Sequence, residues 1–130
     1  MERPTAAQLD EIGKIVEQRL VTAEFQPIVR IGTRETVGFE SFARGPANSS
    51  LATPQAMFRA AAAAEKVRLD KELAKADADV KRVDAKLANE KFVANAPEEV
   101  VEEEKEKREA AIARKTKILE ALERLKKASS

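Results

Sequence analysis

Apolar residues in the second half of the chain recur at alternating steps of four and three. Between residues 69 and 87 the pattern runs through six apolar or small side chains: Leu69, Leu73, Ala76, Val80, Val83 and Leu87. After residues 89–97 the same steps fit a second, partly polar series: Val101, Lys105, Arg108, Ile112, Lys115, Leu119 and Leu122, with Ile118 and Leu125 on its flank. Such spacing is typical of coiled-coil helices. A short connection between two of them predicts an antiparallel hairpin.

The connection at residues 89–97 sets the alignment of this hairpin. Folding about it predicts three facing pairs across the seam: Leu87 with Val101, Ala76 with Ile112, and Leu69 with Leu119. Phe92 and Val93 are then expected to cover the open end of the seam. Pro97 fits the first turn of the second helix, where its missing N–H is not needed.

The first half of the chain has a different pattern. Residues 5–20 predict an amphipathic helix, with Thr5 as its cap and one apolar face: Leu9, Ile12, Val16 and Leu20, with Ile15 beside it. Residues 25–31 and 36–44 are rich in β-branched and aromatic side chains and flank a Gly-containing break, which predicts a β-hairpin. Thr53 and Pro54 mark the start of a helix that continues without interruption to about residue 88.

These patterns predict an α+β, mostly α fold. It consists of an N-terminal helix, a β-hairpin, and a long helix continuing into an antiparallel coiled-coil hairpin. We expect two parts, residues 1–64 and residues 65–130. An isolated two-stranded hairpin is marginally stable in water and leaves its edges open. We therefore expect a homodimer in which two hairpins pair edge to edge about a two-fold axis.

Composition narrows the chemistry. The 130 residues include 24 basic and 23 acidic side chains, so no bulk attraction to nucleic acid or membrane is expected. Histidine and cysteine are absent, which removes the commonest metal ligand and all thiol chemistry. No apolar run is long enough to span a bilayer, and no signal-peptide core is evident. We expect a cytoplasmic protein without a cofactor, a metal or a small-molecule substrate.

The connection also carries a family resemblance. Residues 86–101 (KLANEKFVANAPEEVV) resemble the turn of the C-terminal coiled-coil arm of valyl-tRNA synthetases, and the similarity extends over about residues 65–127. The resemblance implies an arm that leans on tRNA. The arm has no continuous basic stripe, and phosphate neutralisation supplies most non-specific affinity, so we expect the arm alone to bind tRNA weakly. The candidate contacts are cations near the tip: Lys81, Arg82, Lys86, Lys91, Lys105 and Arg108. The alternative is a solvated helix surface with pairs at i and i+4.

A second resemblance covers about residues 6–64. Residues 25–29 (FQPIV), residues 37–46 (VGFESFARGP) and the Thr53-Pro54 pair are similar to the opening of an EAL domain, the family of cyclic di-GMP phosphodiesterases. It implies that Glu40 corresponds to a metal ligand, and Gln26 and Arg44 to residues lining the dinucleotide site. The later barrel strands that complete this family's metal site are not in the chain, so we expect neither metal binding nor catalysis.

Three functional hypotheses follow. The first is a non-catalytic chimera, engineered by fusing an EAL-domain fragment to a synthetase arm, with a structural or oligomerising role. The first alternative is a tRNA-binding coiled-coil module. The second alternative is a degenerate cyclic di-GMP phosphodiesterase or sensor.

Overall fold

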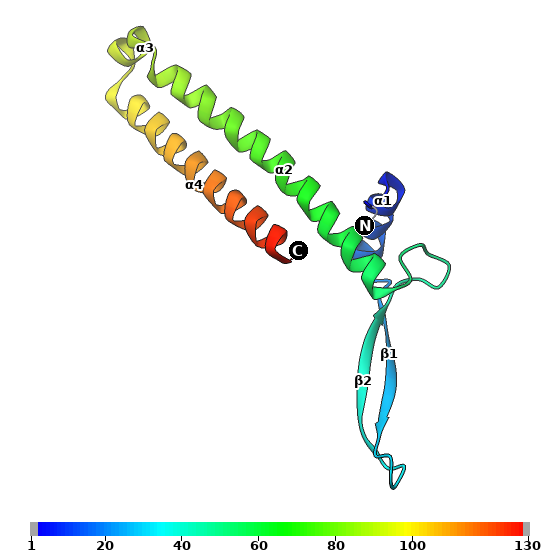
Figure 1. Cartoon of the computed structure of the whole chain (residues 1–130). Helices are drawn as coiled ribbons and strands as arrows, with labels where there is room; N and C mark the ends of the chain where they lie inside the picture. Colours follow the sequence, from blue (N-terminus) through cyan, green and yellow to red (C-terminus); the bar gives the residue numbers. More distant parts are fainter. Residues whose placement is uncertain (1–2, 129–130) are drawn as a thin grey trace. The chain divides into compact units, whose positions relative to one another are not determined.

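The computed structural model describes residues 3–128 and divides into two compact units, residues 1–65 and 66–130. Six elements follow one another along the chain (Figure 1): α1 (Ala6–Glu17), β1 (Thr22–Val29), β2 (Thr36–Arg44), α2 (Pro54–Leu87), α3 (Glu90–Asn95) and α4 (Glu98–Ala128). Long helices with one two-stranded sheet confirm the predicted α+β, mostly α class. Among the described residues, no helix is long and apolar enough to cross a membrane.

Helix α1 begins with a reciprocal cap. The Gln8 backbone N–H donates to Thr5 Oγ1 at 3.3 Å, and the Thr5 backbone N–H donates to Gln8 Oε1 at 2.9 Å. This capping box satisfies two N–H groups that the first turn leaves without partners. The helix ends at Glu17, and the chain then turns at Arg19, whose φ is 55°. The predicted cap at Thr5 is confirmed.

The apolar face of α1 differs from the predicted one. Ile12 and Ile15 are 3% and 1% exposed, whereas Val16 is 65% exposed and Leu20 lies beyond the end of the helix. The prediction of a face through Val16 and Leu20 is therefore wrong, because the helix stops before its fourth turn and turns Ile15 inward. Ile12 and Ile15 form a small core with three residues from α2 (Pro54–Leu87) and the loop before it: Leu51, Met57 and Ala60.

The predicted β-hairpin is confirmed. Strands β1 and β2 pair antiparallel, and a turn containing Arg34 at φ 58° connects them (Figure 1). Opposite residues share a face, so Phe25 and Phe39 lie on one side of the sheet and Gln26 and Glu40 on the other. Phe25 and Phe39 are 66% and 65% exposed. No third strand pairs with the hairpin within the described residues.

Helix α2 begins as the sequence predicts. The Ala56 backbone N–H donates to Thr53 Oγ1 at 3.3 Å, and Pro54 is the first helical residue. Its missing N–H is tolerated there, because the first-turn N–H groups have no partner within the helix. The helix then continues for 34 residues to Leu87. The predicted uninterrupted helix is thus confirmed.

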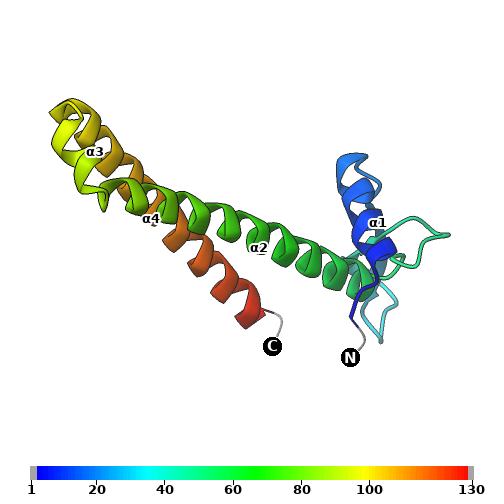
Figure 2. The ribbon, with the colours of Figure 1, turned by 90° about the horizontal axis from the view of Figure 1, so that it is seen from above.

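Helix α3 forms the connection between the coiled-coil helices (Figure 2). Asn89 caps it by accepting hydrogen bonds from the backbone N–H groups of Lys91 and Phe92 at 3.1 and 3.3 Å. Phe92 is half-buried and Val93 is 42% exposed, and no residue of α3 is buried. The expectation that Val93 covers the end of the seam is therefore wrong.

Helices α2 and α4 run antiparallel and face each other along a seam (Figures 1 and 2). On α2 the predicted positions are confirmed, with Leu69, Ala76 and Val83 buried. On α4 the seam recurs at steps of three and four through Val101, Glu104, Arg108, Ala111, Lys115, Ile118, Leu122 and Leu125.

The predicted seam of α4 is therefore only half right. Four predicted seam positions, seven residues apart, are confirmed: Val101, Arg108, Lys115 and Leu122. The positions between them lie one residue earlier than predicted, at Glu104, Ala111 and Ile118. Ile118 is 6% exposed, whereas Ile112 and Leu119 are 37% and 43% exposed, and Lys105 is also exposed. The predicted facing pairs of Ala76 with Ile112 and of Leu69 with Leu119 are wrong for the same reason.

Candidate nucleic-acid interface

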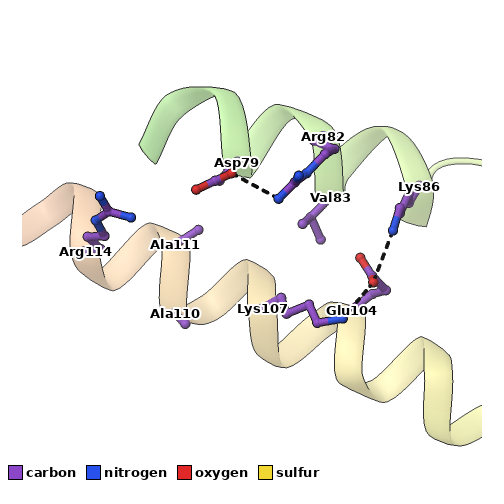
Figure 3. A pocket seen from close by; sticks show the side chains of 9 residues that line it. All are labelled: Asp79, Arg82, Val83, Lys86, Glu104, Lys107, Ala110, Ala111 and Arg114. Carbon is purple, nitrogen blue, oxygen red and sulfur yellow. Dashed lines mark hydrogen bonds and ion pairs between the residues drawn. The ribbon is translucent and has the colours of Figure 1, made fainter. Parts of the chain in front are cut away.

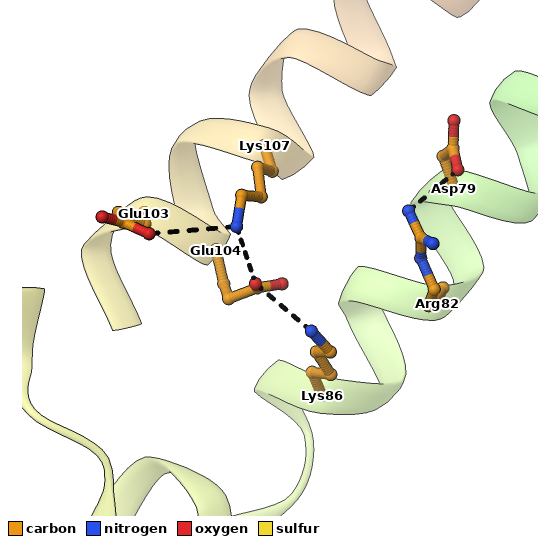
Figure 4. A network of polar contacts seen from close by, with 6 residues as sticks. All are labelled: Asp79, Arg82, Lys86, Glu103, Glu104 and Lys107. Atoms are coloured by element: carbon orange, nitrogen blue, oxygen red, sulfur yellow. Dashed lines mark hydrogen bonds and ion pairs between the residues drawn. The ribbon is translucent and has the colours of Figure 1, made fainter. Parts of the chain in front are cut away.

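A buried carboxylate occupies the seam in the half of the arm nearer to α3. The Glu104 side chain is 8% exposed, and its Oε1 accepts hydrogen bonds from Lys86 Nζ at 3.3 Å and Lys107 Nζ at 3.1 Å (Figure 4). Lys107 Nζ also lies 3.9 Å from Glu103. The hydrogen bond from Lys107, assisted by Lys86, lowers the pKa of Glu104 against the opposing effect of desolvation. Glu104 is therefore charged at neutral pH and holds one lysine from each helix.

Two further ion pairs cross the seam between the helices. Arg108 Nε of α4 donates to Asp84 Oδ1 of α2, and Lys115 Nζ lies 2.6 Å from Asp77 Oδ1. The hydrogen bond from Lys115 lowers the pKa of Asp77. These cations stand at seam positions and reach sideways to their carboxylates. Both are therefore occupied by partners within the arm.

An open groove runs between α2 and α4 beside the Glu104 cluster (Figure 3). Its floor is made of small apolar side chains from both helices: Val83, Ala110 and Ala111. Its rim carries two carboxylates and four cations: Asp79, Glu104, Arg82, Lys86, Lys107 and Arg114. Cations outnumber carboxylates, so the groove favours an anionic ligand.

A second hollow continues the groove away from α3. The two hollows share Ala110 and Arg114, and the second adds one cation, Lys117, and one carboxylate, Glu72, to the rim. Glu72 lies 2.7 Å from Arg68. Its floor is again mostly small or apolar: Leu69, Ala113, Ile118 and Ala121. Together the two hollows form one groove, which we call the arm groove. The arm groove is thus defined by the lining residues of the first and second hollows together.

The cations predicted near the tip are dispersed in the structure. Arg82 and Lys86 line the arm groove, but Arg82 lies 3.0 Å from Asp79 and Lys86 is bound to Glu104. Arg108 and Lys105 lie outside its lining and are paired with Asp84 and Glu102, the latter at 3.0 Å. The remaining two are exposed: Lys81 and Lys91. The structure thus brings only two of the predicted cations together.

Three groove cations were not among the predicted contacts: Lys107, Arg114 and Lys117. Their spacing in the sequence would have identified them. Lys107 and Arg114 are seven residues apart and Lys117 follows three later, so all three share a face of α4.

The residues suggested by the EAL resemblance lie on the hairpin. Gln26 is opposite Glu40 in the strand register, and both are exposed. Arg44 Nε donates to Glu24 Oε2 at 2.7 Å, and its guanidinium lies 5.3 Å from the centre of the Phe42 ring. Residues 3–128 contain no group of three or more side chains able to hold a metal ion together. The EAL resemblance stays a prediction.

Comparison with known proteins identifies the arm. The family model described as "Valyl tRNA synthetase tRNA binding arm" matches residues 62–126, half of the chain. The chain therefore belongs to this family of tRNA-binding arms. The predicted resemblance to the synthetase arm is confirmed over these residues.

Curated relatives point the same way. The chain is 79% identical over 67 residues to valine–tRNA ligases from Bradyrhizobium diazoefficiens and Rhodopseudomonas palustris, covering 52% of this chain and 7% of each relative. It is 47% identical over 62 residues to the ligase from Listeria monocytogenes, covering 48% of this chain and 7% of that relative. The chain thus spans only a small part of the length of these relatives. No solved structure matches the chain.

Proposed function

We propose that the helical hairpin within residues 66–128 binds tRNA through its charged surface and catalyses no reaction itself. The family match over residues 62–126 is the observation that carries this proposal. The arm groove supports it, because its rim has more cations than carboxylates. Phosphate neutralisation by such cations supplies most of the non-specific affinity for nucleic acid.

A salt-dependent binding titration of the full chain tests the proposal. Fluorescence anisotropy with labelled tRNA is measured at about 50 mM and about 200 mM salt. We expect weak binding that declines steeply with salt, and weaker binding to a single-stranded DNA of equal length. No binding of tRNA at the lower salt concentration would exclude the proposed function.

For residues 6–64 we propose a non-catalytic role as an EAL-like fragment joined to the arm. The exposed position of Glu40 and the ion pair between Arg44 and Glu24 support a structural role for these residues. We expect no hydrolysis of cyclic di-GMP in the presence of magnesium or manganese. Hydrolysis that disappears in Glu40→Ala would refute this role.

We also propose that the hairpin pairs two copies of the chain. The observation that favours this is the exposure of Phe25 and Phe39, which lie on one side of the sheet. Light scattering after size-exclusion chromatography should give the mass of two chains, and Phe39→Gln should shift it toward one. The mass of a single chain for the unmodified protein at micromolar concentration would exclude this pairing.

A further inference from the structure

Some cations of the arm form ion pairs with a carboxylate, and others do not. Arg82, Lys86 and Lys107 are bound to Asp79 or Glu104 at distances of 3.0 to 3.3 Å. Within residues 3–128, neither Arg114 nor Lys117 has a carboxylate partner, and both line the arm groove. A phosphate must displace a carboxylate to bind a paired cation, whereas an unpaired cation binds it without that cost. Arg114 and Lys117 are therefore the strongest phosphate-binding positions of the groove.

Helix periodicity extends these two positions into a stripe. Lys107, Arg114, Lys117 and Arg124 fall on one face of α4, and they span about 25 Å at 1.5 Å per residue. Between them on this face stand Ala110, Ala113 and Ala121, whose small side chains line the groove. A backbone phosphate can approach such a surface closely, and several successive phosphates fit along its length.

The other side of the seam has the opposite character. Arg108 and Lys115 of α4 each pair there with an aspartate of α2, Asp84 or Asp77. The arm therefore presents two different sides. On one side, Arg108 and Lys115 form ion pairs with aspartates of α2. On the other side, which is the arm groove, Arg114 and Lys117 have no carboxylate partner within the described residues.

The scarcity of aromatic residues in the arm favours double-helical over single-stranded RNA as its ligand. Phe92 is the only aromatic residue in residues 66–130, and it lies in α3, outside the groove. Recognition of single-stranded RNA relies on aromatic side chains that stack on unpaired bases. A groove without such side chains fits the phosphate backbone instead, where the arginine fork binds two oxygens at once.

On these grounds we infer that Arg114 and Lys117 are the principal contacts of the arm groove with the phosphate backbone of double-helical RNA. This inference rests on the proposed tRNA-binding function and deepens it. The contact is independent of base sequence, because it is made to phosphates. The tip cations Lys91 and Lys105 contribute less, since neither lines the groove.

Two matched double variants of the full chain test the assignment. Arg114→Gln with Lys117→Gln removes two positive charges from the groove, and Lys91→Gln with Lys105→Gln removes two from the tip. Binding of a short RNA duplex is titrated over a series of salt concentrations, and circular dichroism verifies that helix content is unchanged. We expect the groove variant to lose about tenfold in affinity or more. The slope of log K against log salt should fall by about two.

The outcomes separate the two proposals. The tip variant should bind the duplex nearly as the unmodified chain does, and single-stranded RNA of equal length should bind more weakly than the duplex. If the unmodified chain binds but the groove variant keeps its affinity and salt slope, or the tip variant loses as much, the assignment to Arg114 and Lys117 is wrong. Tighter binding of the single strand would refute the double-helical partner. If the unmodified chain binds no RNA, the proposed function fails as well.

Discussion

The two halves of the arm seam are built from different side chains. In the half away from α3, Leu69 and Ile118 are buried and apolar residues pack around them, among them Leu73, Leu122 and Leu125. In the half nearer to α3, the α4 seam alternates Val101 and Ala111 with three charged residues: Glu104, Arg108 and Lys115. Each of the charged residues pairs with a charged side chain of α2. Both halves follow one heptad pattern, although only one of them has an apolar contact surface along both helices.

The two halves therefore have different roles: the apolar half stabilises the packing of the two helices, and the charged half determines their register. Burial of apolar surface is favourable but non-directional, so the apolar half supplies most of the free energy that holds the helices together. Ion pairs near the surface contribute little net stability, but their geometry is specific. We expect the three charged contacts to fix which residues face each other, a role known for polar groups in coiled-coil seams.

The largest expected effect comes from the apolar half. Ile118→Ala should reduce the free energy of unfolding by about 2–5 kcal/mol, because it leaves a cavity beside Leu69 and Ala76. Leu119→Ala is the matched control: the adjacent residue is 43% exposed, and its truncation should cost about 1 kcal/mol or less. Urea unfolding followed by circular dichroism measures both. Equal losses in the two variants would contradict the seam described here.

The same pair of residues shows how far the sequence predicts the seam. The seven-residue period was evident, since Val101 and Leu122 hold their predicted places. The intermediate positions were not, because Ile112 and Leu119 look better suited to a seam than Ala111 or a glutamate at position 104. A carboxylate is acceptable at a seam position only when cations neutralise it, and Lys86 comes from the other helix. That compensation becomes visible only once the two helices are aligned.

The candidate interface was predictable to a similar degree. The turn motif identified the family, and the family match confirms it. The contact residues are less predictable, because proximity to the tip does not show which cations are already paired. Arg108 looked available in the sequence but is bound to Asp84, whereas Arg114 is unpaired within the described residues. Helical spacing shows which cations share a face, but whether a cation is already paired is a three-dimensional property.

A smaller effect is expected at the end of the polar half, where α3 connects the helices. Phe92 is half-buried, so Phe92→Ala should cost about 1–2 kcal/mol, below the 3–5 kcal/mol typical of a fully buried phenylalanine. Val93→Ala, at a 42% exposed position of the same helix, serves as the control and should change the urea midpoint very little. If Phe92→Ala lowers the free energy of unfolding as much as Ile118→Ala does, packing at α3 contributes as much stability as packing in the apolar half.

The smallest effect at neutral pH is expected at Glu104, and it should become apparent through pH. Lys86 and Lys107 are 50% and 58% exposed, so in Glu104→Gln both ammonium groups can turn to water, and the amide still accepts a hydrogen bond. The pKa of Glu104 is lowered in the folded arm, chiefly by Lys107. Its charged form therefore stabilises the arm at neutral pH, and this contribution is lost as the pH falls through the lowered pKa.

Comparison of unfolding midpoints at neutral pH and at about pH 3 tests this expectation. The unmodified chain should lose more stability on acidification than Glu104→Gln. Asp77 has a lowered pKa too, but it is present in both proteins, so its contribution cancels in the comparison. Glu103→Gln removes the same charge from the neighbouring residue, whose side chain is 67% exposed, and should keep the pH dependence of the unmodified chain. If all three proteins respond alike to acid, the charged contacts of Glu104 do not stabilise the polar half, and alignment must come from Arg108 and Lys115.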